Sequence, residues 1–481
     1  MQISRNACLA ILSVFVFAIM FTNSSPFGRD EALYAQSIHE MTLNFTWAPH
    51  YLGKVVAWKP VLTFYMYAPV SGMLSNLHLP IPVEHLYRIP SMILGALSIF
   101  VMYYLALELT KNDSLAWIST LIYASTAVFV LSALLVLTDA PANFFILLSL
   151  YFYIRASSDR RFFYLAGAFA AIVFLSKTML AFMPVLLAVA YYFRKDKSAL
   201  LSKEFAVSVF FIVLAAGINI LFFYLDSGNY GAGLTLKSYY YDFFLRTKIY
   251  TPAYFNFPEA GLVFNFLIAI ALFLPWLPFL ALGLRTLNLG KPTDLLLLAW
   301  LLLFILPLTG SYLQPWYFQP IVPAFSMLVA KGLAGREYKF DQLTSLLVAI
   351  LVLIGILFSV QVLGSSAKGW DADQKTLGQF LDDKENILII SEYSPQTVFY
   401  KFIGSTSQDY SALSYLWVGK HTNLSNEELI STVYNFTHAT GAELADMFFS
   451  GARRIKSVYV PARPFKWLAI QENISQSTVG Y

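Results

Sequence analysis

Within the first third of the chain, acidic residues lie next to apolar runs at two places. A carboxylate in such a place could act as a general base. Asp30 and Glu31 lie in the stretch 28–35, and Asp139 lies in the short stretch 137–141. A charge near an apolar layer is costly, so it is normally kept for pairing or for function. The alternative is a helix cap, which either Asp30 or Asp139 could provide. Composition alone does not separate these roles.

Basic residues beside aromatic rings are the second chemical signal. Lys59 follows Trp58, and its ammonium could reach lipid headgroups or hold a lipid-linked phosphate. Arg246 and Lys248 close the aromatic stretch 239–248, which is typical of a helix in the membrane interface. Such a helix could be a plain anchor. A guanidinium can also grip phosphate oxygens bidentately, which favours Arg246 as a phosphate partner.

Composition defines the class of protein that must position these residues. The chain has 481 residues, 58% hydrophobic and only 12% charged, with a mean hydropathy of +0.61. Soluble domains carry about a quarter charged residues, so an ordinary soluble enzyme and a disordered chain are both excluded. The net charge of +4 is spread along the chain and argues against a nucleic-acid partner. The single cysteine, Cys8, excludes an intrachain disulfide or a cysteine metal cluster.

Apolar runs predict an α-helical polytopic membrane protein. A span needs about 20 apolar residues, and the first run is kept as a span because no small-residue cleavage site precedes Asn23. Basic residues gather in alternate short loops, and the short turns opposite hold only Lys177. This bias places the N-terminus in the cytoplasm. The eleven expected spans are 7–22, 89–108, 115–136, 142–154, 162–176, 179–193, 205–225, 260–282, 294–309, 316–331 and 342–363.

Three long segments fall on the outer side of this topology. Residues 23–88 and 226–259 are outer loops of a transmembrane domain at 1–363. Residues 364–481 form an extracytoplasmic tail, long enough for a small α/β domain, with strands expected at 384–390 and 456–460. The ionisable residues described above, together with Arg88, converge on this one leaflet, which suggests a site at the outer membrane surface.

Several short elements occur in an order similar to that of a known superfamily. The sequence resembles the GT-C integral-membrane glycosyltransferases that use polyprenyl-phosphate sugars, most nearly the protein O-mannosyltransferases and the lipid A aminoarabinose transferases. The resemblance covers about residues 1–335. The elements that carry it are 28–35, Trp47 with Pro49, Lys59-Pro60, 88–91, 137–141, 176–178, 274–276 and 317–323.

The resemblance implies sugar transfer from a dolichyl or undecaprenyl phosphate to a lipid, glycan or protein acceptor. A single displacement at the anomeric carbon would invert its configuration. No cofactor or divalent metal is expected, because basic residues crowd the same leaflet as the candidate acids and would repel the ion. It implies Asp30 as the catalytic carboxylate, with Glu31 and Asp139 beside it. Two features depart from the family pattern. The family often has Lys-Pro-Pro where this chain has Lys59-Pro60-Val61, and it often has a basic residue before the tyrosine that corresponds to Tyr312, where this chain has Gly310-Ser311. The residues expected to bind substrate are Arg29, Tyr34, His50, Lys59, Arg88, Lys177, Arg246, Lys248, Tyr312 and Tyr317.

Three other functions remain open from the residues. An oligosaccharyltransferase would carry Trp-Trp-Asp in its outer domain, where this tail offers only Gly369-Trp370-Asp371. A transporter often shows inverted repeats and midplane charges, whereas here the charges lie at one surface. A non-catalytic anchor that presents the tail would not need Asp139 or the basic residues of the second loop.

Overall fold

The computed structural model describes residues 4–23, 25–57, 59–77, 79–240, 273–308, 315–334 and 349–357, and, in the tail, 375, 379, 387–391, 399–400, 413–417, 456–459 and 467–470. The chain forms two compact units. We call them the helical unit (Met1–Ser24, Thr46–Pro49 and Val55–Ser365) and the mixed unit (Ser25–Phe45, His50–Lys54 and Ser366–Tyr481). Each is described by itself.

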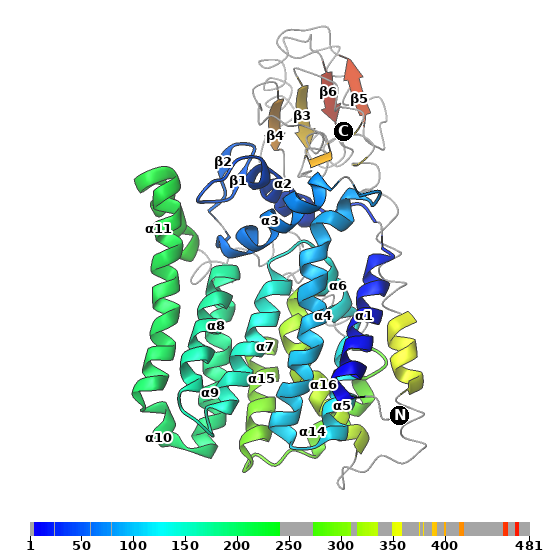
Figure 1. Cartoon of the computed structure of the whole chain (residues 1–481), viewed down its shortest axis with the longest axis vertical. Helices are drawn as coiled ribbons and strands as arrows, with labels where there is room; N and C mark the ends of the chain where they lie inside the picture. The colour runs from blue at the N-terminus through cyan, green and yellow to red at the C-terminus, as the bar shows by residue number, and fades with distance from the viewer. Residues whose placement is uncertain are drawn as a thin grey trace, which may run out of the picture. The chain divides into compact units, whose positions relative to one another are not determined.

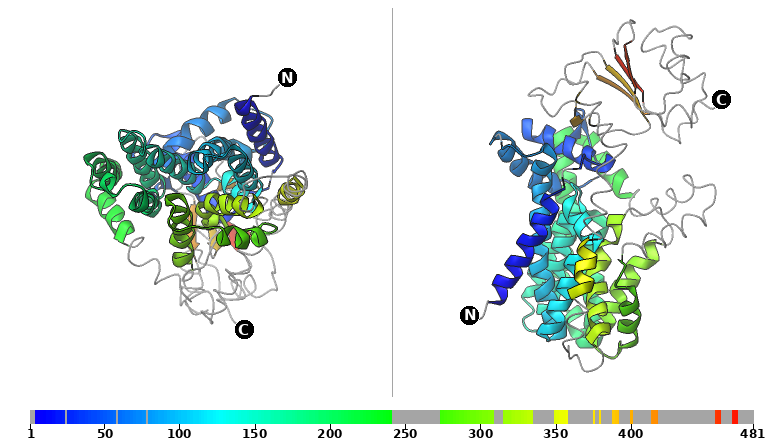
Figure 2. Two further views of the ribbon diagram at one scale, coloured as in Figure 1. Left: turned by 90° about the horizontal axis from the view of Figure 1, so that it is seen from below. Right: turned by 90° about the vertical axis from the view of Figure 1, so that its right-hand side faces the viewer.

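Helices make up the helical unit, and Figure 2 (left) looks along them and shows them side by side. A helix satisfies its own backbone hydrogen bonds, which an apolar solvent requires. In chain order (Figure 1) they are α1 (Arg5–Phe21), α3 (Leu62–Asn76), α4 (Val83–Thr110), α5 (Asp113–Ser125), α6 (Ala127–Leu134), α7 (Asp139–Arg155), α8 (Phe162–Ser176), η1 (Thr178–Ala181), α9 (Phe182–Lys195), α10 (Lys197–Leu200), α11 (Lys203–Tyr240), α14 (Leu277–Arg285), α15 (Pro292–Leu308), η3 (Pro315–Ile321) and α16 (Val322–Ala334).

Two described helices, α4 and α11, are long and apolar enough to cross a membrane alone. Helices α5 and α6 pass the same test together and are bent by 63°. They coincide with the span expected at 115–136, which therefore contains a bend. The bend falls at Thr126, whose Oγ1 donates to the Tyr123 carbonyl and accepts from the amide of Phe129. That hydroxyl ends one helix and starts the next. The total of eleven spans stays a prediction.

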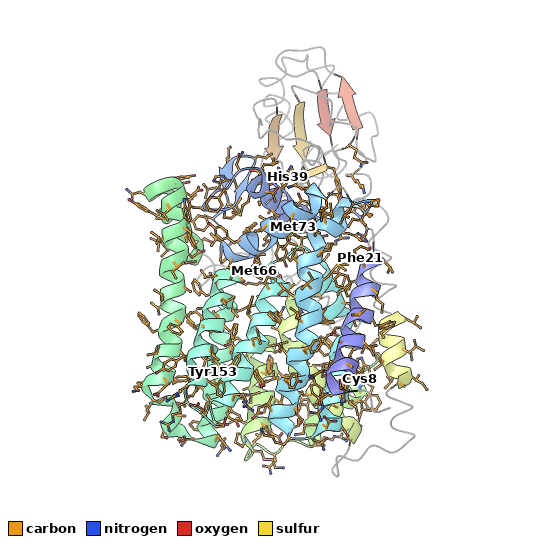
Figure 3. The ribbon with its side chains drawn as sticks, viewed as in Figure 1. Cys8, Phe21, His39, Met66, Met73 and Tyr153 are labelled. Carbon is orange, nitrogen blue, oxygen red and sulfur yellow. The ribbon has the colours of Figure 1, made fainter. Side chains whose placement is uncertain are left out.

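Small and aromatic residues fix the packing of α7, α8 and α11. A Cβ added at Gly167 of α8 would lie 2.4 Å from the Cα of Ser208 on α11, so only glycine permits this close approach. Tyr153 of α7, labelled in Figure 3, is fully buried, and its hydroxyl lies 3.1 Å from the Ser208 Oγ. The three helices are therefore held together by a hydrogen bond as well as by contact.

Helix α11 extends past the point where an outer loop is expected. It breaks at Ser227 and Gly228, where the Gly228 φ is +59°, and then continues as helix to Tyr240. A Cβ on Gly231 would lie 2.2 Å from the Phe223 carbonyl oxygen. The second part of α11 thus folds back along the first, and residues 229–240, within the segment expected as an outer loop, are helical.

The mixed unit contains α2 (Arg29–Leu43), β1 (His50–Tyr51), which pairs with β2 (Lys54–Val55), and a four-stranded sheet. The sheet order is β4-β3-β6-β5, with β3 parallel to both neighbours and β5 antiparallel to β6. These strands are β3 (Ile387–Ser391), β4 (Leu413–Trp417), β5 (Lys456–Tyr459) and β6 (Trp467–Ile470). The expected strands at 384–390 and 456–460 coincide with β3 and β5.

Candidate functional site

The acidic pair of the first loop lies in the first turn of α2, in the mixed unit. The Gly28 N–H donates to the Glu31 carboxylate over 3.2 Å, and Gly28 is the N-cap residue. Glu31 is buried, whereas Asp30 is partly exposed. The expectation that Asp30 caps this helix is therefore wrong, because Glu31 has that role. Both acids lie at the helix N-terminus, whose partial positive charge attracts negatively charged side chains.

Glu40 holds a tight turn against the same helix, and sequence reasoning missed it. Its carboxylate accepts the N–H groups of Leu52 and Gly53 at 2.7 and 3.1 Å, and Gln36 donates to it at 2.9 Å. Leu52 and Gly53 have φ of +53° and +70°, so their amides turn toward one acceptor. This contact ties the turn that follows His50 to α2.

Three residues predicted for the site meet in the helical unit. Asp139 is the first residue of α7 and only 3% exposed. Its Oδ1 lies 2.6 Å from the Nζ of Lys177, which also lies 4.9 Å from the centre of the Tyr317 ring. Thr138, not Asp139, holds the N-cap position, so the capping alternative for Asp139 is wrong. The carboxylate pairs with a lysine that is only partly buried.

Two buried amides that sequence reasoning missed support this group. The Asn143 Nδ2 donates to the Asp139 carbonyl at 2.8 Å and to the Gln319 Oε1 at 2.6 Å. Gln319 also interacts with the hydroxyl of Tyr123. The Asn143–Gln319 bond therefore joins α7 to η3, the element that carries Tyr317. The available signal was an asparagine one helical turn after Asp139 in an otherwise apolar helix.

Arg88 and Lys59 occupy different surroundings within the helical unit. Arg88 of α4 is 1% exposed and donates to the Asn23 carbonyl at 3.4 Å. One turn earlier, the His85 Nε2 lies 2.6 Å from the carbonyl of Phe21, the end of α1 labelled in Figure 3. Lys59 is partly exposed. Helix α3 starts at Leu62, so Lys59 lies shortly before the start of this helix.

Two further residues predicted for the site, Tyr34 and His50, belong to the mixed unit. Tyr34 is buried in α2, and His50 is partly exposed in β1. Within the described ranges, no group of three His, Cys, Asp or Glu side chains could hold a metal ion. The side chain of Arg29 and the residues Arg246, Lys248 and Tyr312 lie outside the described part of the chain.

Comparisons with known proteins agree with this architecture. Residues 7–230 match the family model of dolichyl-phosphate-mannose-protein mannosyltransferase, and no curated protein matches the sequence. The fold is similar to that of ArnT from Cupriavidus metallidurans in the apo state, with a TM-score of 0.64, 16% identity and coverage of 97% of this chain and 98% of that one.

Two further solved structures have similar folds. ArnT bound to undecaprenyl phosphate aligns with a TM-score of 0.62, 17% identity and coverage of 83% of this chain and 85% of that one. The Archaeoglobus fulgidus oligosaccharyltransferase in the apo form aligns with a TM-score of 0.59, 13% identity and coverage of 91% and 68%.

The helical architecture and these similarities define a multi-pass membrane protein with the GT-C fold. The match of residues 7–230 to a mannosyltransferase model adds the chemistry: the protein is a glycosyltransferase. The superfamily resemblance carried by the short sequence elements is thereby confirmed.

Proposed function

We propose that this glycosyltransferase moves a sugar from a dolichyl or undecaprenyl phosphate to a lipid, glycan or protein acceptor at the outer leaflet. The family model is that of a dolichyl-phosphate-mannose enzyme, and ArnT has been solved with undecaprenyl phosphate. The observation that carries the proposal is the first turn of α2, where Glu31 holds the Gly28 amide and Asp30 does not cap the helix. We assign the proton transfer to Asp30, the partly exposed carboxylate of this turn.

The reaction is a single displacement at the anomeric carbon. The acceptor hydroxyl or amine attacks that carbon and gives its proton to Asp30, while the bond to the lipid phosphate breaks and the phosphate leaves with its electron pair. One displacement inverts the configuration. Lys59 and Arg246 stabilise the charge that develops on the leaving phosphate.

The Lys177–Asp139 pair has a supporting role in this proposal. The Asp139 carboxylate pairs with the Lys177 ammonium, and the Tyr317 ring lies against the same ammonium. A fixed ammonium next to an aromatic ring can bind a sugar or a phosphate oxygen.

In the proposed topology, the N-terminus lies in the cytoplasm, and the tail forms an extracytoplasmic α/β domain.

A donor panel tests the proposed function. Purified protein in lipid nanodiscs would receive dolichyl- and undecaprenyl-phosphate sugars, with sugar release and acceptor modification followed by mass spectrometry. We expect release from at least one donor, and its loss in Asp30→Asn. A protein that releases no sugar, yet supports counterflow uptake in vesicles, would instead be a transporter. Glycans lost on deletion of the gene would identify the acceptor.

A further inference from the structure

A buried amide side chain interrupts the apolar surface of α11. Asn219 is 1% exposed and lies in a helix long and apolar enough to span the membrane. Its Oδ1 accepts the Val61 N–H at 3.2 Å, and its Nδ2 donates to the Tyr239 hydroxyl at 2.8 Å. A buried amide is costly unless both ends are paired. Here each end is paired with a different segment.

The two partners of Asn219 border the two segments expected to hold phosphate. Val61 stands two residues after Lys59, and Pro60 between them is buried. Tyr239 opens the aromatic stretch that leads to Arg246, and the reversal of α11 at Gly228 returns it to the level of Asn219. The asparagine therefore joins the residue two positions after Lys59 to Tyr239.

The same face of α11 binds the first-loop residues of the helical unit at two more points. The rings of Phe222 and Trp47 stack with centres 5.7 Å apart, and the Asp226 carboxylate accepts the Ala48 N–H at 3.2 Å. Tyr65 donates to the Trp47 carbonyl at 2.8 Å. Burial and the nearby Asp226 carboxylate raise the pKa of Tyr65 to about 12, so its hydroxyl keeps the donated proton. These contacts, one and two turns after Asn219, hold the segment before α3 on α11.

Tyr239 also connects this arrangement to the end of α8. Its ring meets that of Phe174 edge to face, with centres 5.5 Å apart. Phe174 lies in the last turn of α8, three residues before Lys177. Asn219 and Tyr239 together therefore contact the segment of Lys59, through Val61, and the end of α8 that precedes Lys177, through Phe174.

We propose that Asn219 is a positioning residue for donor binding, which sets the Lys59 segment against Tyr239. This inference rests on the proposed function, because it assumes that Lys59 holds the donor phosphate. Asn219 itself touches neither the phosphate nor the sugar. Its loss should raise the donor KM much more than it changes the acceptor KM, since the segment just after Lys59 loses its hydrogen bond to α11.

Substitutions within α11 test the proposal. Asn219→Leu keeps similar volume but removes both hydrogen bonds, whereas Tyr239→Phe keeps the ring and removes one. We expect the donor KM to rise about tenfold in Asn219→Leu and about threefold in Tyr239→Phe, with the acceptor KM little changed. Asn229→Leu and Tyr230→Phe alter exposed residues of the same helix and should leave both constants unchanged. Tyr239→Phe keeps the test valid where Asn219→Leu fails to fold.

A binding assay separates this inference from the proposed function. Undecaprenyl phosphate and dolichyl phosphate, both without sugar, would be titrated in nanodiscs and followed by native mass spectrometry. If Lys59→Ala and Arg246→Ala leave binding intact, the assignment of the phosphate site is wrong. If those two variants weaken binding while Tyr239→Phe and a folded Asn219→Leu bind and turn over donor normally, only the positioning role is overturned.

Discussion

The Nζ of Lys177 and the Oδ1 of Asp139 lie 2.6 Å apart and join the end of α8 to the start of α7. Neither charge reaches solvent freely, since the side chains are 16% and 4% exposed. Removing one member of a buried pair leaves an uncompensated charge, and this costs more than removing both. Substitutions of this pair therefore measure how much the ion pair contributes to the stability of the helical unit.

Single and double substitutions of the pair should be strongly non-additive. Lys177→Met and Asp139→Leu should each destabilise the protein by about 3 kcal/mol, and the double variant by clearly less than the sum. Thermal unfolding in detergent measures this. Transfer should be low in all three variants, since the proposed site loses Lys177 or its orientation. Additive losses of stability would show that the two charges do not interact.

Proton transfer at α2 should depend on Asp30. Asp30→Asn keeps the size of the side chain but cannot accept a proton, so turnover should fall at least about a hundredfold with little change in donor binding. Glu31→Gln keeps an oxygen that can accept the Gly28 N–H, so its turnover should fall much less. Turnover assays on both variants decide between the acids. If turnover is lost only in Glu31→Gln, the general base is Glu31 and not Asp30.

The sequence predicted the elements of this fold better than their junctions. Apolar length identified the long helices α4 and α11, because a run of that kind in a membrane has no other way to satisfy its backbone. It could not give the bend at Thr126 or the reversal at Gly228, which depend on one hydroxyl and on one φ value. Junctions of this kind are decided by local hydrogen bonds rather than by hydropathy.

The site was partly predictable for the same reason. Isolated charges such as Asp139 and Lys177 stand out in an apolar chain. Buried amides such as Asn143 and Asn219 carry no charge and look like ordinary polar substitutions until their partners are known. Long-range pairing of that kind cannot be inferred from spacing in one sequence.

Anchoring of the turn after β1 by Glu40 should be measurable as local stability. Glu40→Ala leaves the Leu52 and Gly53 N–H groups without their acceptor, and should destabilise the mixed unit by about 2 kcal/mol. Glu40→Gln keeps one acceptor oxygen, so its loss of stability should lie between those of wild type and Glu40→Ala. Hydrogen exchange of the amides in 50–54 is the direct measurement, with faster exchange in the order Ala, Gln, wild type. Equal exchange in all three would mean that the carboxylate does not hold the turn.

A second buried ion pair, Lys331 of α16 with Asp294 of α15, should affect stability but not chemistry. Asp294 also accepts the Asn288 N–H at 2.8 Å, so Asp294→Asn retains that bond and loses only the charge. We expect Lys331→Met and Asp294→Asn each to lower the melting temperature, and the double variant to recover much of it. Donor KM and turnover should stay near wild type at low temperature. A turnover defect in the folded double variant would contradict this assignment.

Transfer should need no divalent metal. A metal would have to take its oxygen ligands from carboxylates, and those near the candidate residues have other partners: Glu31 holds the Gly28 amide, Glu40 holds two amides, and Asp139 holds Lys177. A lipid monophosphate carries little charge, which basic side chains can offset. Purified protein would be assayed after excess EDTA, and again after manganese or magnesium is added. Unchanged turnover is expected. Activity that is abolished by the chelator and restored by either ion would overturn this prediction and favour chemistry of the oligosaccharyltransferase kind.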